Sequence, residues 1–504
     1  MHLSAPDHRD ARIRLRSLLS VSCVAALLSA CASYKGIETS GELRQPAEFA
    51  TASSLPAQHG AWPDVSWGRA VGGEPLQALI DEAIAGNPDL QIAASRVAAA
   101  RAAAEAADAS KKPSYSARFN STYQRFSENY IIPPPYAGSY DSDNSLTLNV
   151  AYDFDFWNKH GAELHRAIAS DKAAQAEQYN ARLVLATSVA HAWIQLARQY
   201  AQLDLNQRQL DVSNKIAHLA ELRFKAGLDA RSQPQQTHQD VANLGAEQAQ
   251  LLESIALTRN QLAALLGQGP DRGLDIERPV LPPDAEAALP DALPLNLLGR
   301  RPDVVAARWQ VEAAQGDIAV AKTAFYPNVN LMAFAGFNSL GLNKLLQSDS
   351  RIIGAGPAIT MPIFESRTLR SALKGRVAEY DSRVATYNIA LTEALHDVAD
   401  QVQSLRAIAQ QSEQQQHATQ AASGNLQLAQ QRERVGTTNM LPALAAELTL
   451  LQQRRRELDL RARRSDVRVS LIKALGGGFD AGAAGLKAGD SAATIHSSSS
   501  RNAS

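Results

Sequence analysis

The 504-residue sequence has little of several features that define common functional classes. Its two cysteines, Cys23 and Cys31, are too few for a disulfide framework. Its 50 basic and 51 acidic residues give a net charge of -1, so the basic excess typical of a nucleic-acid binder is absent. It contains no HExxH, CxxC, P-loop or GxSxG motif, and most of its eleven histidines stand singly on expected helices. We therefore expect no enzyme, no metal site, no cofactor and no nucleic-acid partner.

Hydrophobic runs of membrane-spanning length are also missing. The charge-free run from Leu18 to Ala30 has 13 residues, too few to cross about 30 Å of hydrocarbon as a helix. Four arginines between Arg9 and Arg16 precede it, so residues 1–30 are typical of a cleavable signal peptide. The run ends in Leu28-Ser29-Ala30-Cys31, which resembles the lipobox of bacterial lipoproteins. This resemblance implies a lipidated Cys31 and, since Ala32 rather than Asp follows, sorting to the outer membrane. A plain secretory signal is the alternative.

The chain contains an internal duplication. Asn87-Pro88-Asp89 matches Arg301-Pro302-Asp303 at a shift of 214 residues, and Leu266-Gly267 matches Leu475-Gly476 at a shift of 209. Three further pairs keep the same order: Pro113 with Pro327, Phe156 with Phe364, and Gly227 with Gly436. The fall in the shift indicates an insertion in the first copy, which we place at residues 127–143. Ordered landmarks over this length indicate two copies of one unit.

Each copy is predicted to fold as a helix, two strands and two long helices. Apolar residues recur at spacings averaging about 3.5 residues in four segments, which is typical of coiled-coil packing. Gly227 and Gly436 end the first long helix of each copy as C-caps, and Pro234 and Pro442 stand early in the next helix. The sequence therefore predicts two long helical hairpins with tips near these glycines. A soluble helical bundle would show the same periodicity.

The expected strands alternate apolar and polar side chains. Every second residue from Leu146 to Phe156 is apolar, and Tyr115, Phe119 and Tyr123 show the same pattern upstream. One apolar and one polar face suit a transmembrane β-barrel, although a sheet covering a core would alternate in the same way. Four strands cannot close a barrel, and open edges are not tolerated in hydrocarbon. Three chains would supply twelve strands, and their hairpins would supply twelve helices for a tube.

Several short motifs occur in a fixed order along the two copies. They are Trp67-Gly68, Asn87-Pro88-Asp89-Leu90, Arg300-Arg301-Pro302-Asp303-Val304, Ala324-Phe325-Tyr326-Pro327 and Val435-Gly436-Thr437. Together with the lipobox and the duplication they resemble the TolC-like outer membrane factors, closest to the OprM/NodT-type lipoproteins of RND multidrug efflux systems. The resemblance covers about residues 16–478. It implies an α+β membrane channel, a homotrimer whose twelve-stranded β-barrel is continued by a long twelve-helix α-barrel with an equatorial domain.

With this resemblance the chain divides into six segments. They are a signal peptide (1–30), a lipidated N-terminal segment and equatorial belt (31–75), the first copy (76–269), a Pro-rich connector (270–295), the second copy (296–476) and a disordered tail (477–504). Strands are expected at 114–126, 144–156, 328–338 and 352–364. Long helices are expected at 158–226, 232–266, 366–435 and 439–475. Pro357 and Pro362 fit poorly with a central strand.

The resemblance also implies a function and partners. The protein would be a lipid-anchored duct in the outer membrane with a periplasmic extension, and it would passively export drugs or other small molecules. It would receive them from an RND-type inner-membrane pump through a periplasmic adaptor that contacts the hairpin tips at Gly227, Gly436 and Thr437. A type I secretion channel is the alternative within the same class. A periplasmic adaptor or a structural envelope lipoprotein is the alternative from another class.

The entrance at the second tip departs from the resemblance. Relatives commonly carry Asp in the turn after the second-copy glycine, whereas the matching positions here are Pro442 and Ala445. The entrance is therefore expected to be a mainly apolar constriction that gates by dewetting. Its candidate residues are Met440, Leu441, Leu444 and Glu447. Packing between helices is the alternative role for Leu441 and Leu444.

Overall fold

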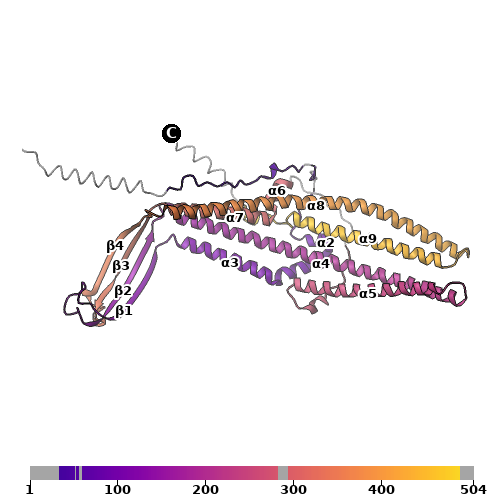
Figure 1. The fold of residues 1–504 in the computed structure, drawn as a ribbon, viewed down its shortest axis with the longest axis horizontal. Helices are drawn as coiled ribbons and strands as arrows, with labels where there is room; N and C mark the ends of the chain where they lie inside the picture. The colour runs from indigo at the N-terminus through magenta and orange to yellow at the C-terminus, as the bar shows by residue number, and fades with distance from the viewer. Residues whose placement is uncertain (1–32, 52, 56–59, 282–292, 488–504) are drawn as a thin grey trace, which may run out of the picture. The chain divides into compact units, whose positions relative to one another are not determined.

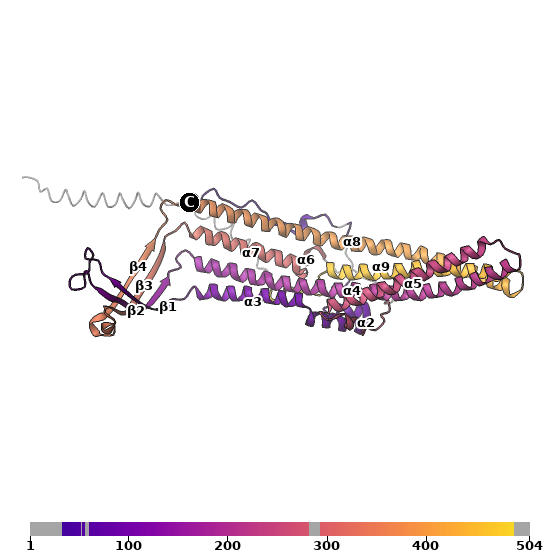
Figure 2. The ribbon, with the colours of Figure 1, turned by 60° about the horizontal axis from the view of Figure 1, so that its bottom comes forward.

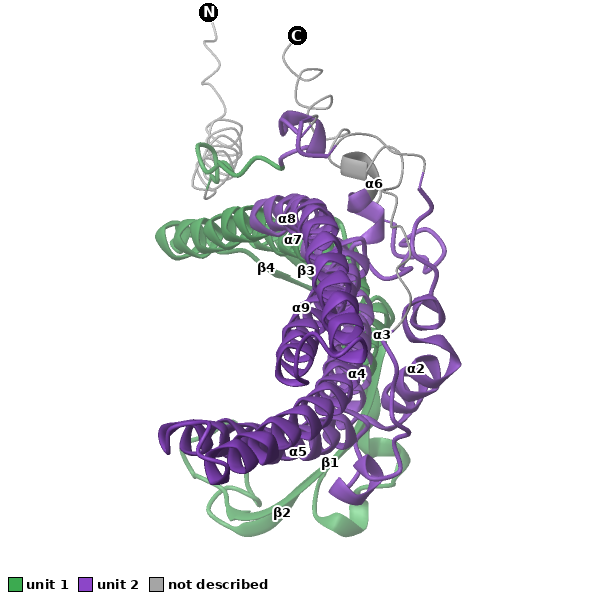
Figure 3. Cartoon of the chain, turned by 90° about the vertical axis from the view of Figure 1, so that its right-hand side faces the viewer, with its two compact units in different colours: residues 1–43, 98–172, 309–386 green, residues 44–97, 173–308, 387–504 purple. Residues whose placement is uncertain are grey.

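The computed structural model describes residues 33–51, 53–55, 60–281 and 293–487. The expected signal peptide, the lipidation site Cys31 and the tail from residue 488 onward lie outside the described residues. The chain forms two compact units, which are coloured separately in Figure 3. Unit 1 comprises Met1–Leu43, Ala98–Lys172 and Trp309–Thr386, and unit 2 comprises Arg44–Val97, Ala173–Arg308 and Tyr387–Ser504.

The two copies contain the same series of elements. The first copy has α2 (Trp67–Gly86), α3 (Pro88–Ala109), β1 (Ser114–Arg125), β2 (Tyr140–Asp153), α4 (Lys159–Lys225) and α5 (Ser232–Leu265). The second copy has α6 (Leu293–Arg300), α7 (Pro302–Thr323), β3 (Asn328–Leu340), β4 (Arg351–Thr360), α8 (Ser366–Arg434) and α9 (Leu441–Ala474). Pro88 and Pro302 begin equivalent helices, and α4 and α8 end at equivalent residues. The two-fold repeat predicted from the sequence is therefore confirmed.

Some element bounds differ from those predicted. β2 begins at Tyr140 rather than 144, because Tyr140 and Asp143 already pair with Arg125 and Thr122 of β1. It ends at Asp153 rather than 156. β4 ends at Thr360 rather than 364, so that only Pro357 lies within it. Pro357 lies in β4, which is an edge strand within the single chain. α2 begins at residue 67, nine residues before the predicted start of the first copy.

Unit 1 contains the sheet and the ends of the helices that adjoin it. The sheet is antiparallel in the order β1-β2-β3-β4, and the strands lie side by side in Figure 1. The end of α3, the start of α4, α7 and the start of α8 leave it as neighbouring helices (Figure 2). Tyr34 and Ile37 pack against Phe325 and Leu373 of this unit. Residues 33–41 are held along α8, where Asp381 accepts hydrogen bonds from the backbone N–H groups of Ser40 and Gly41.

Unit 2 has an extended apolar core. Leu76 of α2, Val189 and Trp193 of α4 and Leu262 of α5 are all buried in its largest cluster. A second apolar cluster joins α8 to α9. It is covered by Leu297 of α6 and by three residues that precede α2, namely Phe49, Leu55 and Trp62. Within the described ranges, no helix is both long enough and apolar enough to cross a bilayer.

The prediction of a disordered tail from residue 477 is wrong for residues 477–487. Phe479 and Leu486 are buried, and the backbone N–H of Ala481 donates to the carbonyl oxygen of Gly299 at 2.8 Å. Gly476, at φ 87°, turns the chain back so closely that a Cβ there would lie 1.9 Å from the Arg300 carbonyl oxygen. The Gly/Ala-rich composition led to the prediction of disorder. It gives no sign that Phe479 and Leu486 are buried or that Gly476 makes a tight turn at positive φ.

Candidate functional site

The strand register collects the apolar side chains of all four strands on one face of the sheet. Tyr115 pairs with Val150, which pairs with Ala333, which pairs with Ala355, and paired residues point to the same side. The large apolar members of this face are Tyr115, Phe119, Tyr123, Leu146, Leu148, Val150, Tyr152, Val329, Leu331, Phe337, Ile353 and Ile359. Several are widely exposed, such as Ile353 at 86% and Leu148 at 54%. An apolar patch of this extent marks a surface that another phase or chain covers.

The opposite face is polar in the first copy and mixed in the second. Ser116, Arg118 and Asn120 lie on this face of β1, and Thr147 and Asn149 lie on it in β2.

In β3 the same face carries Met332 and Phe334. The ring of Phe334 lies over Gly354 of β4, where a Cβ would come within 2.6 Å of it. The less regular alternation of the second copy therefore has a packing reason: an aromatic residue fills the space that a glycine leaves.

Aromatic side chains lie at both ends of the apolar face. Tyr123 and Tyr140 stack with ring centroids 6.1 Å apart at the end that carries the loop of residues 126–139. At the other end Trp157 stacks on Tyr326 at 4.4 Å and donates its indole N–H to the carbonyl oxygen of Pro327. Between them, β1 runs for about nine residues from Tyr115 to Tyr123, the length of strand that spans a membrane. Aromatic belts around an apolar band are typical of membrane-embedded strands.

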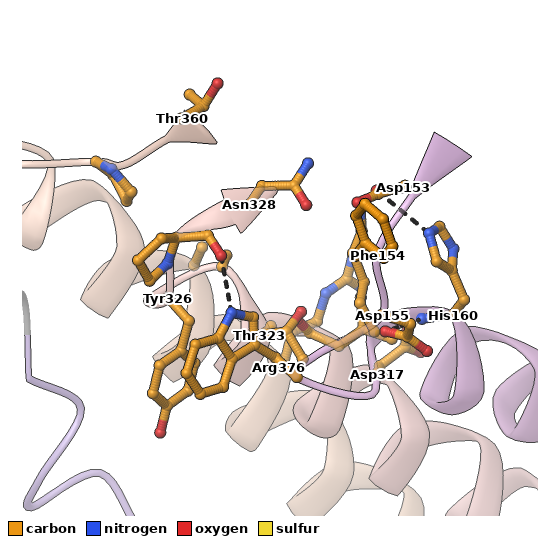
Figure 4. Close-up of a pocket in the computed structure, with 18 residues that line it drawn as sticks. Asp153, Phe154, Asp155, His160, Asp317, Thr323, Tyr326, Asn328, Thr360 and Arg376 are labelled. Carbon is orange, nitrogen blue, oxygen red and sulfur yellow. Dashed lines mark hydrogen bonds and ion pairs between the residues drawn. The ribbon is translucent and has the colours of Figure 1, made fainter. Parts of the chain in front are cut away.

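A cavity of about 440 Å³ lies in unit 1 where the sheet passes into the helices (Figure 4). His160, at the start of α4, has its Nε2 3.2 Å from Asp153 Oδ2 of β2 and its Nδ1 3.2 Å from Glu163 Oε2. Asp155 accepts hydrogen bonds from the backbone N–H groups of His160 and Gly161, which caps α4. These contacts fix the strand-to-helix junction. Among the described residues, no cluster of His, Cys, Asp and Glu could hold a metal ion.

The two hairpin tips are built by the same turn. Gly227 and Gly436 adopt φ angles of 73° and 75°, a conformation that favours glycine. Beyond each glycine the next backbone N–H reaches back five residues, from Leu228 to the Arg223 carbonyl and from Thr437 to the Arg432 carbonyl. The side chain of Thr437 donates to the same Arg432 carbonyl at 2.9 Å. Both tips lie where the sequence predicted them.

The structure separates the entrance candidates into different environments. Leu444 is buried and packs with Leu451 of its own helix against Val212 of α4. This contact agrees with the helix-packing alternative for Leu444. Met440 is 40% exposed, while Leu441 and Glu447 are half-buried. These last three remain available on the surface of the second tip.

An ion-pair network around a buried arginine was not predicted, although two of its three residues, Arg301 and Asp303, stand in one of the motifs. Arg301 is only 8% exposed; its Nη1 lies 2.7 Å from Asp397 Oδ2 of α8 and its Nη2 lies 2.6 Å from Asp303 Oδ2. Burial by itself would lower the pKa of Arg301, but the two carboxylates outweigh it and raise that pKa. No sequence signal joins Arg301 to Asp397, because 96 residues separate them.

The sequence of the chain is similar to proteins of known family. Residues 79–268 and 293–477 match the outer membrane efflux protein family. The chain is 36% identical over 362 residues to the fusaric acid resistance protein FusA of Burkholderia cepacia, covering 70% of this chain and 68% of that protein. It is 28% identical over 474 residues to the multidrug resistance outer membrane protein MdtP of Escherichia coli K12, covering 92% and 97%.

A solved structure shows the same fold. The crystal structure of the outer membrane protein VceC from Vibrio cholerae superposes with a TM-score of 0.76 at 36% identity, covering 83% of this chain and all of that one. Neither an adaptor nor a structural envelope lipoprotein accounts for a match that spans both copies. The chain therefore belongs to the outer membrane efflux protein family.

Proposed function

We propose that three copies of this outer-membrane efflux channel close one twelve-stranded barrel and form the duct of a tripartite efflux system. The observation that carries the proposal is a four-stranded sheet with one apolar face, whose edge strands β1 and β4 have no further strand beside them among the described residues. Hydrocarbon cannot satisfy the free N–H and C=O groups of an edge strand, so the strands need neighbours from other chains. Three sheets give a strand number that is common for membrane barrels.

A lipid anchor at Cys31 would suit this arrangement. The first described residues run beside the aromatic end of the sheet, where the Tyr34 hydroxyl lies 3.1 Å from that of Tyr326. Arg370 donates to the carbonyl oxygens of Ser33 and Lys35 and so fixes the start of this segment. Since Cys31 precedes Ser33 by two residues, an acyl chain on it would begin near the aromatic belt. That is the level of the membrane interface.

The hairpin tips are the surfaces offered to a periplasmic adaptor, which would connect the duct to an inner-membrane pump of the RND type. The turns at Gly227, Gly436 and Thr437 stand in open surroundings, since no atom lies within 4 Å of a Cβ built on either glycine. Met440, Leu441 and Glu447 line the second tip and are the proposed entrance residues. The duct itself carries out no chemistry.

The relatives indicate the size class of the cargo. One is named for resistance to fusaric acid and another for multidrug resistance, so small organic molecules are the proposed substrates. The test is a deletion of the gene in its own host, followed by measurement of susceptibility to a panel of toxic small molecules. We expect increased susceptibility, restored by the wild-type gene. Unchanged susceptibility, with the protein correctly inserted in wild-type cells, would contradict the export function.

A further inference from the structure

A groove in unit 2 lies between α8 and α9. It has a volume of about 690 Å³, which suits a small organic molecule. Four glutamines of one helix face two arginines, one aspartate and one leucine of the other. The lining residues are Gln410, Gln411, Gln414 and Gln415 of α8, and Arg456, Asp459, Leu460 and Arg463 of α9.

The groove lies on the face of α8 that turns away from the covering segments. Val398 and Val402 of α8 belong to the cluster that Phe49 and Trp62 cover. Gln411 follows Val402 by nine residues, which at about 100° per residue places it half a turn around the helix. In the proposed trimer the covering segments form the outer belt. The groove would then lie on the side of α8 that faces away from this belt, toward the duct.

The groove carries one positive charge in excess, because Arg456 and Arg463 outnumber Asp459, its single acid. Arg456 and Arg463 are seven residues apart, so both point to the same side of α9, and both are exposed. Within the described part of the chain neither guanidinium has an ion-pair or hydrogen-bond partner. The neighbouring Arg455, by contrast, forms an ion pair with Glu247. Asp459, the one acid of the groove, accepts a hydrogen bond from Gln202 of α4 at 2.7 Å.

A third guanidinium lies on the adjoining face of α4. Gln202 bonds to Asp459, and His191 lies 3.0 Å from Asp466, so this face of α4 turns toward α9. Arg198 stands between them, one helical turn from Gln202. Its Nε is buried and has no hydrogen-bond partner. Arg198 therefore adds positive charge on the α4 side of Asp459 without lining the groove itself.

We propose that the groove binds small organic anions, above all carboxylates, as they pass through the duct. The planar guanidinium fork of arginine matches a carboxylate, and the glutamine amides supply further donors. Leu460 offers an apolar contact for the rest of the molecule. This inference rests on the proposed export function and names a substrate class for it.

The test is binding of para-fluorobenzoate and of its neutral counterpart para-fluorobenzamide to the full-length protein in detergent, followed by fluorine NMR. Wild-type protein should broaden the signal of the acid and leave that of the amide nearly unchanged. The pair Arg456→Gln and Arg463→Gln should weaken binding of the acid about tenfold, as expected for lost charge-assisted hydrogen bonds. The matched control pair is Arg454→Gln and Arg461→Gln, on exposed arginines of the same helix outside the groove. It should bind like wild type.

Equal broadening of the acid and the amide by wild-type protein would overturn the inference and needs no variant. An unchanged affinity in the Arg456 and Arg463 pair, or an equal loss in the control pair, would also overturn it. The Arg456→Lys and Arg463→Lys pair keeps the charge and should retain the preference for the acid. The mass of the same samples separates the two proposals. Trimers without anion preference refute this inference alone, whereas monomers refute the proposed function.

Discussion

The two copies of the unit stabilise equivalent helix junctions with different side-chain contacts. At the junction before the second helix of each copy, the first has Asn87 and the second has Arg301. The Asn87 amide donates to the Leu265 carbonyl at 2.9 Å and its oxygen accepts from the backbone N–H of Asp89. Arg301 instead forms two ion pairs, one of them with Asp397 of α8. Asp397 corresponds to Ser188 in the first copy, so an arginine in place of Asn87 would have no equivalent carboxylate to pair with.

The difference shows that duplication preserves the geometry of the backbone more strictly than the identity of its contacts. Helices α3 and α7, and likewise α5 and α9, begin and end at equivalent residues, and both tips use a glycine at positive φ. The polar face of the sheet has nevertheless diverged, because Arg118 and Asn120 of the first copy correspond to Met332 and Phe334 of the second. Each copy can thus acquire its own surface while the shared framework holds.

The largest effect is expected where the second copy buries a charge. Arg301→Gln removes two charge-assisted hydrogen bonds, but the Asp303 and Asp397 carboxylates keep access to water, so it should cost about 2 kcal/mol of stability. Asn87→Ala, at the equivalent junction, loses only neutral hydrogen bonds and should cost roughly 1 kcal/mol. Thermal unfolding of the detergent-solubilised variants measures both. If the two variants lowered the melting temperature equally, the contrast between the junctions would be false.

The next effect should be the same in both copies, because it depends on the shared apolar face. Leu148→Asp in the first copy and Ile353→Asp in the second should each hinder insertion into the outer membrane, by up to about 2 kcal/mol per chain. The adjacent Thr147→Asp lies on the polar face and is the control. Membrane fractionation measures the inserted share. Normal insertion of the Leu148 variant would contradict the assignment of this face to lipid.

A smaller, pH-dependent effect on stability is expected in the segment that follows the second copy, at Asp480. The backbone N–H groups of Ala483 and Gly482, together with Arg300, hold the pKa of Asp480 below its ordinary value, although burial opposes them. A lowered pKa in the folded state adds stability above the ordinary pKa of the carboxyl group, near 4, and this stability is lost as the pH falls through the folded pKa. The protection of residues 479–486 against hydrogen exchange, relative to the unfolded chain at the same pH, should therefore fall below about pH 4. Asp480→Asn should remove that pH dependence, and its persistence would refute the assignment.

The smallest effect concerns the two tips. Arg223 and Asp229 form a two-pronged ion pair at the first tip, which lowers the pKa of Asp229 mainly through the hydrogen bond from Arg223. The equivalent of Asp229 at the second tip is Thr438, which has no charge. Asp229→Ala should speed hydrogen exchange at the Leu228 amide, whereas Thr438→Ala should leave the Thr437 amide unchanged. Equal responses would show that the ion pair does not stabilise the first tip.

The parts of the fold that the sequence predicted depend on local rules. Glycine at a helix end, proline at a helix start and alternation along a strand act within a few residues, so the repeat, the tips and the apolar face could all be predicted. The parts it could not predict depend on distant partners. The Arg301 network needs Asp397, and the packing of Phe479 and Leu486 needs a surface built by other elements. The burial of Leu444 likewise needs Val212 of α4.

The most direct test of the account is the mass of the protein extracted from the outer membrane in detergent, determined by native mass spectrometry with the detergent removed. The account predicts three chains in one particle, because the apolar sheet face and the two free edges require neighbours. A stable monomer that retains its fold after gentle extraction would leave those edges open. That result would contradict the shared barrel and the duct that depends on it.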